Sequence, residues 1–182
     1  MKSLNLGNPV LRLILLQALL LALYGCVSPQ ADVHQAARQK EEKPVVIRSV
    51  IGNYNQIWDD LTTALNNRGL VISSVSHVEE MIKRTGRALN QNKKIFARAK
   101  VMEFCSAIIS RKMMEKNPHY IAFCPYQIIV YSLPDNPNKV YLSYRRLYWG
   151  NTKDQDRAVL KTVENLLSSL INEVIETQKQ YQ

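Results

Sequence analysis

The spacing of hydrophobic residues predicts a series of strands and helices that begins near Val45 and ends near Ile175. Runs rich in β-branched or aromatic residues predict strands, and apolar residues three or four positions apart predict helices. By these patterns we expect strands at 45–52, 70–75, 93–105, 126–133 and 139–148. We expect helices at 54–69, 76–89, 106–117 and 159–175.

The order of these elements predicts the fold class. It contains no strict strand–helix–strand repeat, and the last two strands flank turn-forming residues at 134–138, as in an antiparallel hairpin. Such an order is typical of an α+β protein. We therefore expect a single two-layer domain at 45–177 and a short tail at 178–182. Its sheet is expected to be antiparallel or mixed, with helices packed on one face and a long C-terminal helix.

The second helix carries two further predictions. Ser76 and Glu79 stand three positions apart, as in a capping box with Ser at the N-cap. Four apolar residues at helical spacing are expected to form a buried stripe. These are Val78, Met81, Ile82 and Leu89.

The first 25 residues have the anatomy of a secretory signal. Lys2 and Arg12 supply positive charge, and 13–23 is apolar except for Gln17. Eleven helical residues cover roughly 17 Å, which is shorter than the roughly 30 Å core of a bilayer. A stable transmembrane span is therefore not expected here.

The leader ends in a segment, 23–26 (Leu-Tyr-Gly-Cys), that resembles a bacterial lipobox. In that motif a cysteine is lipidated and becomes the mature N-terminus. The resemblance implies a lipoprotein signal peptide at 1–25, palmitate or similar acyl chains on Cys26, and a polar tether at 26–44. Val27, rather than Asp, follows the cysteine, which by the bacterial sorting pattern implies the outer membrane, facing the periplasm. The alternative is a secreted protein with a chance cysteine.

The charge of the chain bears on its partners. The formal net charge is +9, and it stays at +7 without Lys2 and Arg12 of the leader. A basic protein favours anionic partners. The Lys and Arg residues are scattered and match no nucleic-acid-binding motif, so nucleic acid is not an expected partner. We expect the membrane, through the lipid anchor, and an envelope protein or anionic ligand.

Two cysteines remain if Cys26 is lipidated, Cys105 and Cys124. An even pair in an oxidising envelope favours a disulfide, and two buried free thiols or a redox pair are the alternatives. A metal site would need His77 or His119 as well, but the spacings match no compact zinc motif. No metal and no cofactor are therefore expected.

The sequence contains none of the common catalytic motifs. It has no HExxH, no Ser/His/Asp order and no glycine-rich phosphate loop, for which six glycines leave little material. The most suggestive surface combines aromatic residues with two arginines, and would bind an anionic or sugar ligand by stacking and cation–π contacts. Its members are Tyr141, Tyr144, Tyr148, Trp149, Arg145 and Arg146. Alternation along an ordinary strand gives the same pattern.

Three segments of the chain resemble a bacterial and archaeal family, that of the domain of unknown function 302. Its members share a histidine shortly after a strand, a strand that ends in an FCNP-like turn, and a PCRI-x-VY segment that leads into a hairpin. His77 stands at the histidine position, and Cys105 stands in the turn, here Phe-Cys-Ser-Ala. In the third segment Tyr126 replaces the second cysteine and Gln127 the basic residue, while Cys124 lies two positions earlier.

The resemblance covers about residues 45–177 and implies a fold without a reaction. We therefore expect a membrane-anchored envelope lipoprotein whose domain is a non-catalytic binding or assembly module. Its candidate ligand-binding residues are His77, Tyr144, Arg145 and Arg146. The alternative is a thiol redox or metal-dependent envelope factor that uses Cys105 and Cys124 with His77.

Overall fold

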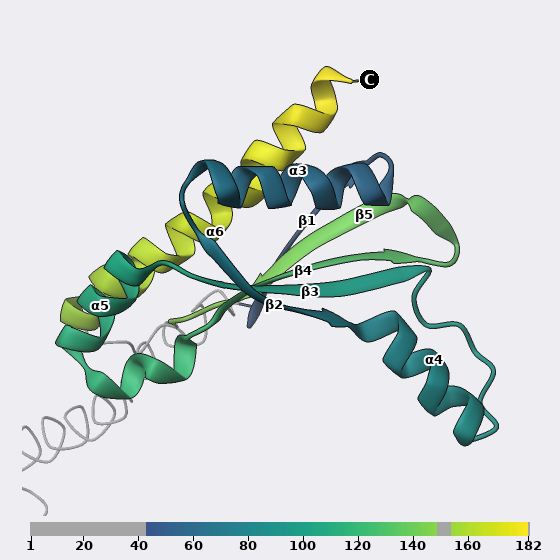
Figure 1. Cartoon of the computed structure of the whole chain (residues 1–182), viewed down its shortest axis with the longest axis horizontal. Coiled ribbons are helices and arrows are strands. Elements are labelled where there is room, and N and C mark those ends of the chain that lie inside the picture. Colours follow the sequence, from purple (N-terminus) through teal and green to yellow (C-terminus); the bar gives the residue numbers. More distant parts are fainter. Residues whose placement is uncertain (1–42, 149–153, 182) are drawn as a thin grey trace, which may run out of the picture. The chain divides into compact units, whose positions relative to one another are not determined.

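The computed structural model describes residues 43–148 and 154–181 (Figure 1). The leader, Cys26, the tether up to residue 42 and Trp149 lie outside the described residues. The elements in chain order are β1 (Val45–Ile51), α3 (Tyr54–Asn67), β2 (Val71–His77), α4 (Val78–Ala88), β3 (Arg98–Cys105), α5 (Ala107–Lys116), the 3₁₀ helix η1 (Pro118–Phe123), β4 (Tyr126–Leu133), β5 (Asn136–Arg145) and α6 (Asp154–Gln180).

The five strands form one sheet in the order β1-β5-β4-β3-β2, and every neighbouring pair is antiparallel. The β4–β5 hairpin lies at the centre, and β1 and β2 are the edges. Its turn is tighter than expected, because β5 already begins at Asn136. The prediction of an α+β domain with a long C-terminal helix is confirmed, and the sheet is wholly antiparallel rather than mixed.

The helices α3 and α6 pack together over one face of the sheet (Figure 1). Successive side chains of a strand point to opposite faces, so every second residue meets this helix layer. Ile128, Val130 and Leu142 of the central hairpin have no exposed surface. The helices contribute a matching set of buried residues, Ile57, Leu61, Leu65, Val163, Leu167, Leu170, Ile171 and Val174.

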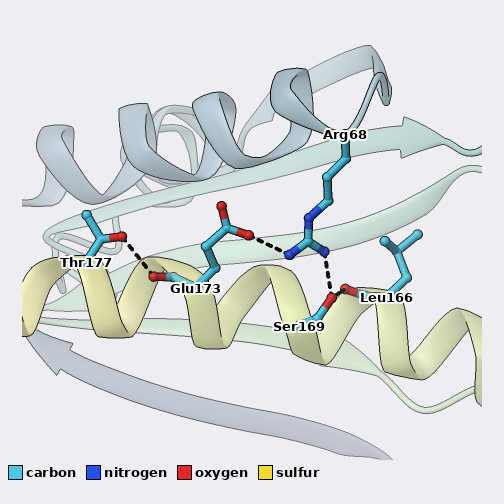
Figure 2. Close-up of polar contacts among 5 residues, drawn as sticks. All are labelled: Arg68, Leu166, Ser169, Glu173 and Thr177. Atoms are coloured by element: carbon cyan, nitrogen blue, oxygen red, sulfur yellow. Dashed lines mark hydrogen bonds and ion pairs between the residues drawn. The ribbon is translucent and has the colours of Figure 1, made fainter.

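Polar contacts fix α3 against α6 at two places. Arg68, the C-cap of α3, donates hydrogen bonds to the Ser169 hydroxyl and to the Glu173 carboxylate, as Figure 2 shows. In the middle of α3, the Asp60 carboxylate accepts a hydrogen bond from the Gln178 amide at 2.6 Å. Because α6 continues to Gln180, the expected domain end at residue 177 falls inside the helix.

The capping box expected at the start of α4 is not formed. β2 continues through His77, which becomes the N-cap without a capping hydrogen bond from its side chain. Ser76 is held in the sheet opposite Val101, and the Glu79 carboxylate accepts instead from the backbone N–H of Ala99 at 2.9 Å. Strand pairing has therefore displaced the local capping motif.

The stripe expected to be buried on α4 is only partly covered, since Val78 and Ile82 are half-buried. No residue of this helix is buried, and the side chains of Met81 and Leu89 are 48 % and 61 % exposed. Figure 1 shows α4 projecting away from the sheet, with the following loop returning to β3. The periodicity correctly predicts the helix, but the rest of the domain does not fully bury its apolar stripe.

Two further features concern the ends of strands. The 3₁₀ helix η1, which the sequence patterns did not predict, follows α5 and leads into β4. The third strand begins at Arg98, so residues 93–97 belong to the loop before it. Within the described residues, no helix is long and apolar enough to cross a membrane.

Candidate functional site

Cys105 and Cys124 meet at one end of the sheet. Cys105 is the last residue of β3, and Cys124 caps η1 just before β4. Because Phe104 pairs with Tyr126 across the two antiparallel strands, the residues just beyond this pair lie side by side. The two sulfur atoms are 3.1 Å apart, and both cysteines are free thiols that are partly buried.

The half-buried thiols lie next to two buried residues, Ser110 and Tyr126. The Ser110 hydroxyl of α5 lies 3.9 Å from the Cys124 sulfur and 2.9 Å from the Tyr126 hydroxyl. Burial is the main cause that raises the pKa of Cys105 to about 11, and the neighbouring Cys124 raises it further. At pH 7 only about one in ten thousand such thiols is ionised, and the thiolate is the reactive form. The pair is placed for bonding but is poorly activated.

The two histidines are not brought to the thiols. His77 pairs with Lys100, whereas Cys105 pairs with Val71 at the other end of the same two strands. Five residues of β-strand separate these positions along β3, or roughly 17 Å. His119 is exposed on η1. Within the described residues, no three His, Cys, Asp or Glu side chains come together as a set that could hold a metal ion.

A pocket of ≈ 300 Å³ opens beside the thiol pair, where β1 and β4 begin and β5 ends. Its lining combines the two candidate arginines, Arg145 and Arg146, with Gln127 and apolar side chains. The apolar part includes Val45, Phe123, Leu147 and Leu167. The pocket can therefore enclose a small ligand that has one anionic end and one apolar end.

Arg145 is the last member of a row of polar contacts that crosses four strands. Its guanidinium donates to the Gln127 side-chain oxygen at 2.6 Å, and the Gln127 amide donates to Glu103 at 2.7 Å. The second oxygen of Glu103 accepts from the Ser74 hydroxyl at 3.0 Å. Arg145 itself is exposed, and a guanidinium carries five N–H donors. The row thus orients Arg145 while leaving donors for a ligand.

Arg146 has a different role from Arg145. Its guanidinium lies 3.4 Å from the carboxylate of Glu164, which is 5 % exposed and also accepts from the Leu147 N–H at 2.7 Å. It donates as well to the backbone oxygen of Lys43 at 3.1 Å. Arg146 therefore compensates the charge of a buried carboxylate of α6.

The aromatic residues of the suggested surface do not form one patch. Tyr144 is 4 % exposed and belongs to the core, and burial raises its pKa. Tyr141, on the opposite face of β5, stacks on Tyr131 with ring centroids 5.0 Å apart. Tyr148 lies beneath the Arg157 guanidinium. Strand alternation places Tyr141 and Tyr144 on opposite faces, and among the described members of the set only the two arginines line the pocket.

The architecture defines an α+β domain with a five-stranded antiparallel sheet and one helical layer. Residues 46–174 match the family described as "Domain of unknown function DUF302", and the chain belongs to that family. Among solved structures, the chain resembles an uncharacterized conserved protein DUF302 from Bacillus stearothermophilus. The TM-score is 0.60 with 14 % sequence identity, over 72 % of this chain and 98 % of that chain, so this likeness shows the fold. No match was found among curated proteins.

The site contains residues that the sequence alone did not single out for binding. Gln127 stood out only as a departure from the family motif, and Glu103 and Ser110 did not stand out. The signal that finds them is strand register, because Glu103 and Gln127 are directly opposite each other. Register depends on the pairing of strands that are distant in sequence, and no local pattern specifies it.

Proposed function

We propose that this DUF302 protein is an envelope lipoprotein, anchored through Cys26 in the outer membrane and facing the periplasm, whose domain is a non-catalytic binding module. The support for the anchor lies in the sequence. A short apolar leader ends in a lipobox-like segment, and a polar stretch separates Cys26 from the domain. Several acyl chains hold a protein at a bilayer more firmly than one chain does.

The observation that carries the binding proposal is Arg145 at the mouth of the ≈ 300 Å³ pocket. A guanidinium recognises carboxylates and phosphates through paired hydrogen bonds, and Gln127 holds this one in place. The apolar lining suits a short hydrocarbon segment. The proposed ligand class is therefore a small amphiphilic anion, or the anionic terminus of an envelope molecule.

Titration calorimetry tests this proposal with octanoate and octyl phosphate as probes and octanol as the uncharged comparison. The full chain should bind the two anions more tightly than the alcohol. Arg145→Ala should weaken anion binding by about tenfold or more, since a hydrogen bond to a charged group contributes about 1.5–3 kcal/mol. Arg145→Lys should recover only part of the affinity, because an ammonium lacks the planar fork.

Lys139→Ala is the matched control, because it removes one positive charge from the other end of the same strand. It should leave binding unchanged. Equal affinity for octanoate and octanol, or an equal loss in the Lys139 and Arg145 variants, would reject the pocket as an anion site.

Mass spectrometry of the native protein tests the anchor. We expect a mature N-terminus at Cys26 with acyl chains attached, and release of Cys26→Ser from the membrane fraction. An intact Met1 together with an unmodified Cys26 would contradict this part of the proposal.

The distance of 3.1 Å between the Cys105 and Cys124 sulfurs favours a second candidate function, a thiol redox role. In an oxidising envelope, one thiolate would attack the disulfide of an oxidant such as oxidised glutathione and release one glutathione thiolate. The second thiolate would then attack the protein sulfur of the mixed disulfide, form the Cys105–Cys124 bond and release the other glutathione thiolate. The pair loses two protons and two electrons, and the oxidant is reduced to two thiols. Because the raised pKa of Cys105 disfavours rapid exchange, a stable bridge fits this site better than a cycling redox centre. A metal-dependent form would need His77, which lies at the other end of the strand.

A further inference from the structure

Helix α4 and the loop that follows it form an arm, residues 78–97, that leaves the sheet and returns to β3 (Figure 1). The large apolar side chains Met81, Leu89 and Ile95 of this arm are between 48 % and 61 % exposed. Met81 and Leu89 belong to the apolar stripe of the helix, whose other members, Val78 and Ile82, are half-buried. An amphipathic helix normally gains its stability by burying such a stripe.

The same arm carries a concentration of positive charge. Three basic residues lie on α4 and two on the loop, namely Lys83, Arg84, Arg87, Lys93 and Lys94. Within the described part of the chain, none of the five has a carboxylate partner. The acidic residues of the arm are engaged elsewhere, because Glu79 contacts Ala99 and Arg98 on β3 and Glu80 faces His77 at 4.0 Å.

A hollow of ≈ 530 Å³ lies between α4 and the returning loop. Its lining includes four of the five basic residues, the carboxylates of Glu79 and Glu80, and the apolar residues Ile82, Ile95 and Phe96, so the cations outnumber the carboxylates. A concave surface lined by ammonium and guanidinium groups beside exposed apolar side chains has the chemistry of a phospholipid headgroup site. Its cations meet the phosphate, and its apolar residues enter the region just below the headgroups.

We propose that the arm docks on the surface of an anionic phospholipid bilayer and so sets the orientation of the domain on the membrane. The combination of exposed apolar residues with unpaired cations favours a bilayer over another protein, because basic amphipathic helices are typical of membrane surfaces. This inference rests on the proposed lipid anchor, which keeps the domain close to the bilayer.

The length of chain before the domain permits this docking. The tether enters at Val45, which pairs with Arg145, and α4 leaves from the opposite end of the sheet. A seven-residue strand spans roughly 23 Å. Eighteen residues separate Cys26 from Val45, and a chain of that length can span at most about 60 Å. The arm can therefore reach the same membrane that holds the anchor.

Hydrogen exchange measured by mass spectrometry tests the docking on the full, lipidated chain. The chain is reconstituted into phosphatidylcholine vesicles with or without phosphatidylglycerol. We expect exchange in residues 79–95 to slow by about tenfold in the anionic vesicles only. Helix α5, at 107–116, is the internal reference and should not change. The protection should be lost at about 0.5 M NaCl, where screening shortens the Debye length to roughly 4 Å.

Two variants sharpen the test. Lys83→Gln with Arg87→Gln removes two cations from the hollow and should abolish the protection. Arg111→Gln with Lys112→Gln removes the same charge from exposed positions of α5 and should preserve it. Circular dichroism checks that both variants are folded, since all four positions are exposed helix surface.

The outcomes separate the docking from the anchor. Vesicle flotation measures the anchor, and exchange measures the arm. A chain that floats with the vesicles but shows equal exchange of α4 in neutral and anionic lipid would overturn the docking while leaving the anchor intact. Protection that grows with protein concentration in neutral lipid would identify a second copy as the occupant. Inorganic phosphate that alone protects the arm would identify a free-anion site, which also contradicts docking.

Discussion

Helices α4 and α6 have the same kind of sequence pattern and opposite surroundings. Both place apolar residues at helical spacing. The α6 residues Leu167, Leu170 and Ile171 are at most 2 % exposed, whereas no residue of α4 is buried. The difference is one of position, since α6 lies against the sheet and α4 projects beyond it (Figure 1).

This contrast shows that a helical spacing of hydrophobic residues makes two predictions, and that they can be fulfilled independently. The period predicts a helix, and it predicts that one side of the helix avoids water. For α6 the domain itself supplies the cover, through the core face of the sheet and α3. For α4 the domain half-buries Val78 and Ile82 and leaves Met81 and Leu89 available to an external surface.

The largest expected effect comes from shortening a leucine on each helix. Leu170→Ala in α6 should destabilise the domain by about 2–5 kcal/mol, because it leaves a cavity in a packed core. Leu89→Ala, at the end of α4, should change the free energy of unfolding by less than about 0.5 kcal/mol. Urea denaturation measures both. Similar losses in the two variants would mean that α4 is covered in solution.

Oxidation of the thiol pair should affect the region next to α6 and leave α4 unchanged. A disulfide between Cys105 and Cys124, 19 positions apart, should stabilise the domain by roughly 3 kcal/mol. Because the bridged segment contains α5 and η1, hydrogen exchange should slow there and not in residues 78–88. Denaturation with oxidised glutathione or with dithiothreitol gives the comparison, and Cys124→Ser is the variant that should not respond.

Two carboxylates of α6, those of Glu164 and Glu173, should contribute unequally to the free energy of unfolding. Glu164→Ala should cost about 1–3 kcal/mol, since it leaves the buried Leu147 N–H without an acceptor. Glu173→Ala removes a partly exposed ion pair with Arg68 and should cost less than about 1 kcal/mol. Thermal unfolding ranks the two, and an equal or reversed ranking would contradict the role given to Glu164.

The smallest change in stability is expected from titration of Cys105. Its pKa is raised to about 11 in the folded state, so folding disfavours the thiolate. The stability is fully present below the ordinary thiol pKa and is lost as the pH rises towards 11. The rate of alkylation by iodoacetamide should follow the same thiol and keep rising above pH 9. A plateau already reached near pH 10 would show an ordinary thiol.

Local patterns predicted most of the elements but not how they meet. The β-branched runs predicted the central hairpin, and the long apolar period predicted α6, because both signals depend on neighbouring residues. The capping box predicted at the start of α4 is absent because a tertiary interaction prevails over the local motif. The pairing of β2 with β3 holds Ser76 opposite Val101, so Ser76 does not become the N-cap.

The candidate site was predictable only in part, for a related reason. Arg145 stood out because arginine is the residue suited to anions, but its orientation depends on Gln127 and Glu103, which other strands supply. Arg146 looked equivalent to Arg145 in the sequence. It has a different role because its guanidinium forms an ion pair with Glu164 of α6. Such differences follow from register and burial, which a single sequence does not specify.

The contacts of Arg146 with the start of β1 have a mechanical consequence. Its backbone N–H donates to the Pro44 oxygen at 3.0 Å, and its side chain donates to the Lys43 oxygen at 3.1 Å. Any tension transmitted along the chain from residue 42 reaches these two bonds before it reaches the ladder between β1 and β5. The two hydrogen bonds of Arg146 therefore protect the edge strand β1 from being separated from β5 when the chain is pulled at its N-terminal side.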